Sequence, residues 1–424
     1  MMKKFVLLVM MAIAPSIAWS GVGDEFTVTT QNGVEMTFRI ISETEKTCEV
    51  YGFDWHTPSI SVETGGEVYI PDHANGYLVT GIAQYSFTYC SEMTSISIPA
   101  TVKTIATMAF SDNLKLSTII VDEANTTLDS RDQCNAVIQT ATNTLIVGCK
   151  NTVIPNSVTA LGFYSFLDCH SLASINIPAS VSSINTNAFR GCSGLDEITV
   201  DENNPVYDSR ENCNAVIETA SNTLVVGTNN TIIPQSVTTI GEFSFYSRSN
   251  LKAIHIPSLV RTIENSAFSY SGLESIDIPC RVIGESAFNT TPLKEVKLSN
   301  LLRTIGSKAF NSCGSLTSIT IPASVTNIGE DAFRWTRLKT IVSCIDNPFD
   351  IGNNTFKYDS DVTLYVPSGT KALYVETPGW NRFSTIIEDE KIVSNLKGDI
   401  NDDGYLDVRD LVKLADMIMH KDTE

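Results

Sequence analysis

The stretch SITIPASVTNIGEDAF, Ser318 to Phe333, has two close copies earlier in the chain. They are SINIPASVSSINTNAF, Ser174 to Phe189, and SISIPATVKTIATMAF, Ser95 to Phe110. Extending this alignment places ten phenylalanines in register: Phe87, Phe110, Phe166, Phe189, Phe245, Phe268, Phe288, Phe310, Phe333 and Phe356. Most neighbours in the series are 20–23 residues apart, and such a fixed period is typical of repeat architectures.

The repeat unit is L-x-x-I-x-I-P-x-S-V-x-x-I-x-x-x-A-F-x-x-C. Its I-x-I alternation indicates a short strand, and the Pro ends that strand because it has no amide hydrogen to donate. The V-x-x-I pair and the A-F step supply further apolar side chains. One unit cannot bury this face alone, whereas units stacked at the strand spacing of ~4.8 Å form a continuous core. The predicted fold is mainly β, a solenoid of short strands and helical turns.

Two steps in the phenylalanine series are 56 residues long, which is one repeat plus an insertion. The insertions, Val121 to Pro155 and Val200 to Pro234, match each other at an offset of 79 residues. In each, two apolar runs flank a polar turn containing Asn143 or Asn222, a pattern that predicts a β-hairpin.

The chain divides into five predicted segments. Residues 1–20 have a basic start, a short apolar run and the small-residue end Ala18-Trp19-Ser20, which indicates a secretory signal peptide. Residues 21–65 alternate as β-strands do and are expected to form an N-terminal β cap. The solenoid covers residues 66–388, and its last part, with Tyr374, Trp380 and Phe383, is expected to cap the terminal repeat. A linker, 389–397, precedes the final segment, 398–424.

The net charge is -19, from 29 Lys and Arg against 48 Asp and Glu. Such a charge repels nucleic acid and anionic membranes, so a nucleic-acid partner is not expected. No apolar run after the signal peptide reaches the ~20 residues that span a bilayer, so no transmembrane helix is expected in the mature chain. The predicted location is secreted, extracellular or on a bacterial cell surface.

The pattern I-x-I-P-x-S-V-x-x-I-G-x-x-A-F-x-x-C resembles the BspA-like bacterial leucine-rich-repeat proteins from roughly Gly66 to Glu388. This resemblance implies a leucine-rich-repeat solenoid that acts in adhesion to host matrix proteins or to other cells. The chain departs from the pattern where the turn from Pro279 to Phe288 is two residues short. It departs again at Leu298-Ser299, where the Pro is missing. Local kinks are expected at both places.

Enzymatic activity is not expected, because the sequence contains no H-E-x-x-H, G-x-S-x-G or C-x-x-C motif and no phosphate-binding loop. His170 follows Cys169 directly, and a structural role is expected for both.

Four of the ten cysteines, Cys90, Cys169, Cys192 and Cys313, occupy one repeat position, where other turns carry Asn113, Arg248 or Thr336. A position that accepts such replacements indicates packing or capping, and free buried thiols are expected.

The outward residues of the strand column are the natural binding surface of such a solenoid. They are Ser95 and Ser97, Ser174 and Asn176, Glu197 and Thr199, Ala253 and His255, Ser275 and Asp277, Glu295 and Lys297, and Ser318 and Thr320. These side chains are small and polar and lack the aromatic anchors that dominate many interfaces. The column is consistent either with a face that binds an extracellular protein or glycan or with a merely solvated one.

The last segment contains GDINDDGYLDVRDLVKLADMIMHK. Its oxygen-bearing residues have the spacing of a calcium loop, with side chains from Asp399, Asn401, Asp403 and Asp410, the Tyr405 carbonyl and a water held by Asp407. A structural Ca²⁺ is therefore predicted. The alternative is an acidic helix start that the helix dipole stabilises.

This tail resembles one calcium repeat of a type I dockerin. Dockerins that bind cohesins carry two such repeats, so cohesin binding is doubtful. Two functions remain open at this point. The chain is a non-catalytic recognition or adhesion module, or it is a non-catalytic component of an extracellular glycan-degrading assembly attached through its tail.

Overall fold

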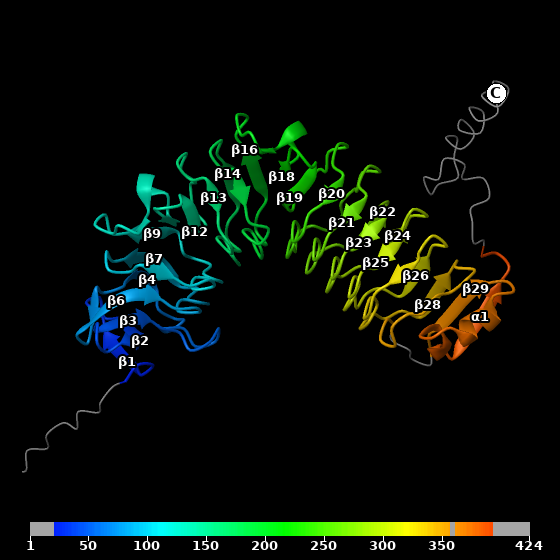
Figure 1. Cartoon of the computed structure of the whole chain (residues 1–424), viewed down its shortest axis with the longest axis horizontal. Coiled ribbons are helices and arrows are strands. Elements are labelled where there is room, and N and C mark those ends of the chain that lie inside the picture. The colour runs from blue at the N-terminus through cyan, green and yellow to red at the C-terminus, as the bar shows by residue number, and fades with distance from the viewer. Residues whose placement is uncertain (1–20, 357–360, 393–424) are drawn as a thin grey trace, which may run out of the picture.

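A computed structural model describes residues 21–356 and 361–392, and in it the repeats stack into an arch (Figure 1). The predicted signal peptide lies outside the described residues. The same is true of the predicted calcium ligands Asp399, Asn401, Asp403, Tyr405, Asp407 and Asp410. Within the described part of the chain, no helix is long and apolar enough to cross a membrane. The mainly β solenoid predicted from the repeats is confirmed.

The N-terminal segment forms the expected β cap. Strands β1 (Glu25–Thr29), β2 (Glu35–Ser42) and β3 (Thr47–Val50) pair antiparallel in chain order. Met36, Phe38 and Ile40 alternate along β2 and are buried, as the period of a strand requires. Strand β3 then pairs in parallel with β6 (Tyr77–Ile82), which also pairs with β5 (His73–Ala74), so the cap continues into the first repeat.

Parallel strands, mostly of four residues, form the column that the I-x-I pattern predicts. Their bounds are β4 (Gly66–Tyr69), β7 (Met93–Ile98), β9 (Thr118–Val121), β14 (Ser174–Ile177), β16 (Glu197–Val200), β22 (Ser275–Ile278), β24 (Glu295–Leu298), β26 (Ser318–Ile321), β28 (Thr340–Ser343), β29 (Thr363–Pro367) and β30 (Thr385–Asp389). In β14, β22 and β26 the two isoleucines are buried and the residues between them are exposed. The apolar pattern thus sets the register.

A second column consists of two-residue strands from the V-x-x-I part of the repeat. Its members are β8 (Thr104–Ile105), β13 (Ala160–Leu161), β15 (Ser183–Ile184), β20 (Thr239–Ile240), β21 (Thr262–Ile263), β23 (Val282–Ile283), β25 (Thr304–Ile305) and β27 (Asn327–Ile328). These strands pair in parallel, but the pairing stops between β8 and β13 and again between β15 and β20. Both interruptions coincide with the insertions.

Each insertion contains the predicted hairpin. The first comprises β10 (Leu128–Asp129), the 3-10 helix η1 (Arg131–Gln133), β11 (Ala136–Gln139) and β12 (Thr144–Gly148). The second comprises β17 (Tyr207–Asp208), η2 (Arg210–Asn212), β18 (Ala215–Glu218) and β19 (Thr223–Gly227). Strands β12 and β19 each pair in parallel with the next short strand, so each takes the place of one strand in the short column.

The rung phenylalanines form a stacked ladder at the centre of the solenoid. From Phe245 to Phe356, neighbouring ring centroids are 4.8–5.3 Å apart and the rings are nearly parallel. The ladder passes through Phe268, Phe288 and Phe310 at 5.3 and 5.2 Å with interplanar angles of 2° and 5°. The kinks expected from the short turn and the missing proline are therefore absent from the ladder. In the long strand column, however, the pairing stops between β24 and β26, next to the missing proline.

The C-terminal segment covers the last rung as predicted. It contains the helix α1 (Lys371–Glu376) and the 3-10 helix η3 (Trp380–Arg382). Trp380 is fully buried with its ring centroid 5.7 Å from that of Phe356, and its indole N–H donates to the Phe349 carbonyl oxygen at 2.9 Å. The hydroxyl of the buried Tyr374 donates to the carbonyl of Ile345 at 2.7 Å. An otherwise open stack end is thus closed by hydrogen-bonded aromatic rings.

Candidate functional site

The outward residues of the strand column lie at the surface, as predicted. Ser174, Asn176 and His255 are exposed. The Lys297 ammonium lies 3.6 Å from a carboxylate oxygen of Asp277 and 3.8 Å from one of Glu295. Exposed ion pairs of this kind contribute little stability. The face also contains a hollow of about 290 Å³, which is lined by Ser174, Asn176, Glu197, Thr199 and the exposed Val153, among others. A ligand at the column stays a prediction.

A different face is formed by the turns that carry the rung phenylalanines, which we call the turn edge. The helical turns expected here are tight turns with residues in the left-handed region, two before and two after the phenylalanine. Tyr85 (φ 64°) and Tyr89 (φ 59°) flank Phe87, and Ser286 (φ 55°) and Thr290 (φ 57°) flank Phe288. The left-handed conformation costs a residue with a Cβ roughly 1–2 kcal/mol and is rare for bulky side chains.

Aromatic residues nevertheless occupy many of these strained positions. Residues with both an aromatic ring and a positive φ are Tyr85, Tyr89, Tyr164, Phe243, Tyr270 and Trp335. Several are well exposed, with relative exposures of 39% for Tyr89, 48% for Tyr270 and 59% for Trp335. Because Gly or Asn would adopt this backbone at lower cost, folding alone does not account for exposed rings here. Together with Trp55, Phe163 and Tyr246, these six residues make up what we call the aromatic edge.

Charged side chains lie between the rings. A hollow of about 220 Å³ is lined by Trp55, Tyr89, Asp112, Asp168, Arg190 and Tyr246, among others. The Arg190 guanidinium donates to the hydroxyls of Tyr164 at 3.0 Å and Tyr246 at 3.2 Å, and its central carbon lies 4.6 Å from the centre of the Tyr246 ring. The hollow thus combines aromatic surface, two carboxylates and a fixed guanidinium. Across residues 21–356 and 361–392, no group of three or more His, Cys, Asp or Glu could hold a metal ion.

His170 links neighbouring turns through two hydrogen bonds, in agreement with the structural role expected for it. Its Nε2 lies 3.0 Å from Oδ1 of Asp112 and its Nδ1 lies 2.9 Å from the Ser193 hydroxyl. Asp112 and His170 belong to the turns on either side of the first insertion, so this pair bridges the interruption. The hydrogen bond to Asp112 raises the pKa of His170 above its ordinary value. Burial, and then the charge of Asp112, raise the pKa of Asp168 to about 6.

We expect the stability of the chain to be lower at pH 7 than at pH 5, because the pKa of Asp168, raised to about 6, and the raised pKa of His170 are both higher in the folded than in the unfolded state. The folded chain binds more protons over this range, so the stabilisation is present at low pH and lost as pH rises through the folded pKa values. Asp112, Arg190 and Tyr89 also face this cluster. The free energy of unfolding from denaturant titration at the two pH values measures the effect. Asp168→Asn should weaken this pH dependence, and an unchanged slope in the variant would contradict the assignment.

All ten cysteines are free, and nine of them are buried. The free buried thiols expected at the repeat position of Cys90, Cys169, Cys192 and Cys313 are among them. Burial raises the pKa of the Cys90 and Cys192 thiols to about 12 and that of the Cys313 thiol to about 11. A thiol with so high a pKa is a poor nucleophile, so these cysteines act as small apolar side chains of the core.

The aromatic edge is not predicted by the alternation of apolar and polar residues, because alternation gives side-chain direction only along the strands. A signal was available, since Tyr, Phe or Trp recurs two residues before or after a rung phenylalanine. That these positions project from the turns depends on their left-handed backbone.

The repeats match the family model described as the BspA type leucine rich repeat region, with 6 copies over residues 72–140, 144–219, 226–339 and 281–374. These matches cover more than half of the chain, which therefore belongs to this family. The resemblance drawn from the repeat pattern is confirmed, whereas the dockerin-like tail stays a prediction.

Solved structures of similar fold include the pneumococcal vaccine antigen PcpA, with 18% identity, 87% of this chain and 99% of that chain covered, and a TM-score of 0.47. A leucine-rich repeat protein from Eubacterium ventriosum has 20% identity, coverages of 74% and 96%, and a TM-score of 0.43. A leucine rich cell surface protein from Faecalibacterium prausnitzii has 18% identity, coverages of 87% and 98%, and a TM-score of 0.37. No protein with curated annotation matches the chain.

Proposed function

We propose that this chain is a secreted or cell-surface recognition module, without catalytic activity, that binds a protein of the host matrix or of another cell through its aromatic edge. The observation that carries the proposal is the placement of exposed aromatic rings at left-handed turn positions such as Tyr89, Tyr270 and Trp335. Tyr, Trp and Arg are the side chains that contribute most binding energy at protein interfaces. Arg190, fixed between Tyr164 and Tyr246, fits the same description.

The rigidity of the edge supports this proposal. The rings are attached to turns that are locked by the buried ladder, so little conformational entropy is lost when they contact a partner. The signal-like N-terminus and the net charge of -19 are consistent with an extracellular protein that avoids anionic membranes.

Replacing Tyr89, Tyr270 and Trp335 together with Ser should weaken binding to the partner at least ~10-fold, since a central aromatic side chain contributes about 1–2 kcal/mol or more. Melting temperature should change little, because the three rings are exposed. Binding of the full chain to immobilised matrix proteins, to other bacterial cells and to a glycan panel measures the effect.

The matched control replaces Asn176, Thr199 and Thr320 of the strand column with Ser, and binding should be retained. Equal losses in the two variants would contradict a role specific to the aromatic edge. A second control removes residues 393–424. If that deletion alone abolished binding, attachment through the tail to a glycan-degrading assembly would replace the present proposal.

A further inference from the structure

The two insertions interrupt the phenylalanine ladder at equivalent places, between Phe110 and Phe166 and between Phe189 and Phe245. At both breaks a glycine of the hairpin lies against the next ring. A Cβ added at Gly148 would lie 2.1 Å from a ring carbon of Phe166, and one at Gly227 would lie 2.1 Å from a ring carbon of Phe245. At each break the backbone of this glycine therefore lies where the ring of a preceding rung would otherwise stack. A space is left beside the glycine.

At the second break an arginine fills this space. Arg248 is 1% exposed. Its Nε donates to the Gly227 carbonyl at 2.8 Å, and its Nη1 donates to the carbonyls of Cys192 at 2.9 Å and Tyr246 at 3.2 Å. Phe189, on the other side of the space, is only 4% exposed. The space at the second break is thus filled by a guanidinium, which donates to three carbonyl oxygens and is surrounded by apolar side chains.

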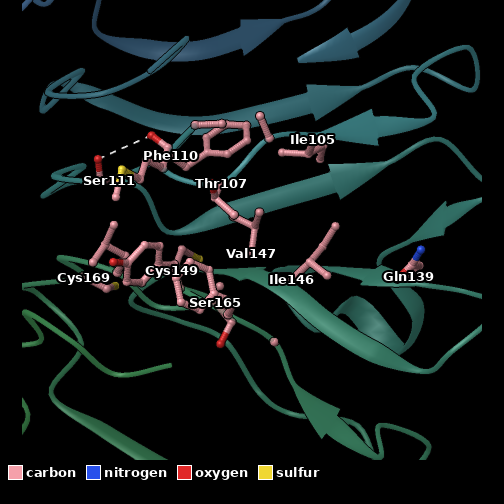
Figure 2. A pocket seen from close by; sticks show the side chains of 18 of the residues that line it. Ile105, Thr107, Phe110, Ser111, Gln139, Ile146, Val147, Cys149, Ser165 and Cys169 are labelled. Atoms are coloured by element: carbon pink, nitrogen blue, oxygen red, sulfur yellow. Dashed lines mark hydrogen bonds between the residues drawn. The ribbon is translucent and has the colours of Figure 1, made fainter. Parts of the chain in front are cut away.

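At the first break the same space is open. The 79-residue offset puts Cys169 at the position of Arg248 and Ser111 at the position of Arg190. A cleft of about 380 Å³ remains, and in Figure 2 Ile146 and Val147 extend from β12 toward the turn that carries Phe110. Phe110 and Val147 are half-buried, whereas their counterparts Phe189 and Val226 are buried.

The acceptors used by Arg248 are kept in the open cleft. The counterparts of Gly227, Cys192 and Tyr246 are Gly148, Asn113 and Leu167, and all three line it. Asn113 is 7% exposed, and its side-chain Oδ1 is buried without a hydrogen-bond partner. A buried acceptor of this kind favours a ligand that brings donors.

We propose that the cleft between Phe110 and Phe166 binds an arginine side chain of the partner protein. The aliphatic part of that side chain lies along Phe110, Ile146 and Val147. Its guanidinium donates to the backbone carbonyls of Gly148 and Asn113, as Arg248 donates to those of Gly227 and Cys192 at the second break. The planar, weakly hydrated guanidinium suits several carbonyls better than an ammonium does. The charged side chain that lines the cleft is Lys103, while Asp112, which pairs with His170, and Asp168 lie in turns that border it. This inference rests on the proposed function, because it identifies an anchor residue of the partner.

The test is a titration of the full-length chain with a capped glycine–arginine–glycine peptide, followed by NMR. Cys169→Arg supplies the cleft with the counterpart of Arg248 and should weaken peptide binding at least ~10-fold, as expected for a displaced anchor residue. Cys169→Ser is the matched control, since it leaves the cleft open, and it should bind as the wild type does. Val147→Trp closes the cleft from β12 and keeps the test decisive if Cys169→Arg does not fold. Peptides with citrulline or norleucine in place of arginine should bind at least ~10-fold more weakly.

Equal binding to the wild type and to Cys169→Arg, or norleucine binding as well as arginine, would overturn the proposal. The Tyr89, Tyr270 and Trp335 variant should leave the peptide titration unchanged, since none of these residues lines the cleft. Loss of partner binding in that variant but not in Cys169→Arg would refute the cleft as an anchor site while the proposed function stands. An unchanged partner affinity in both variants would refute both proposals, even if the peptide binds.

Discussion

Phe333→Ala should destabilise the solenoid by about 3–5 kcal/mol, as large-to-small replacements of buried rings do. The Phe333 ring is fully buried, with centroid distances of 5.3 Å to Phe310 and 5.1 Å to Phe356 and interplanar angles of 6° and 1°. Its removal leaves a cavity with stacked rings on both sides. Those rings belong to separate rungs, whose spacing the strand columns fix, so they cannot close the cavity. Denaturant unfolding followed by circular dichroism measures the loss.

Phe110→Ala is the matched control, because the Phe110 ring is half-buried and stacks on Phe87 alone, at 5.1 Å, before the first break. Its loss should be clearly smaller than that of Phe333→Ala. A loss below ~1 kcal/mol at Phe333, or equal losses at the two sites, would show that the ladder does not carry the stability of the stack.

The ladder could be predicted from sequence because every rung repeats the same chemistry. Ten phenylalanines in register, with isoleucines at fixed offsets, determine which side chains are buried, and a packed stack is then the arrangement that buries them all. The capping role of Tyr374 and Trp380 could be predicted in the same way, since the apolar side chains of a terminal repeat must be shielded from water. The kinks expected near Phe288 are absent from the ring ladder, whereas the pairing of the long strand column does stop after Leu298, where the proline is missing.

The candidate site was harder to predict, for two physical reasons. The aromatic edge depends on left-handed backbone at Tyr89 and Tyr270, a property of the turn that hydrophobic periodicity does not report. The cleft depends on contacts between turns 56 residues apart, such as Arg248 with Cys192. In sequence, Arg248 and Cys169 look like interchangeable residues at one tolerant repeat position. In the structure one fills its space and the other leaves it open.

That difference gives the second large effect. Arg248→Cys should lower stability by roughly 2–4 kcal/mol, since hydrogen bonds to a charged donor contribute about 1.5–3 kcal/mol each and the release of a buried charge offsets part of the loss. It should also open a second cleft at Phe189, so that the arginine peptide binds at two sites per chain where the wild type has one. Unfolding by denaturant and the stoichiometry of the peptide titration measure the two effects on the same protein.

Arg248→Lys separates charge from shape. A lysine keeps the cation but lacks the planar fork that reaches the carbonyls of Gly227 and Cys192 together, so it should restore only part of the stability and leave the second site closed. Cys169→Arg is the reciprocal change at the first break and should remove the site that Arg248→Cys adds at the second. If Arg248→Cys neither destabilised the chain nor added a site, the openness of the first cleft would have to come from another difference between the two breaks. One such difference is Ser111, the counterpart of Arg190. Another is Leu128, which lines the first cleft, whereas its counterpart Tyr207 is buried and accepts a hydrogen bond from the Ile184 N–H at 3.1 Å.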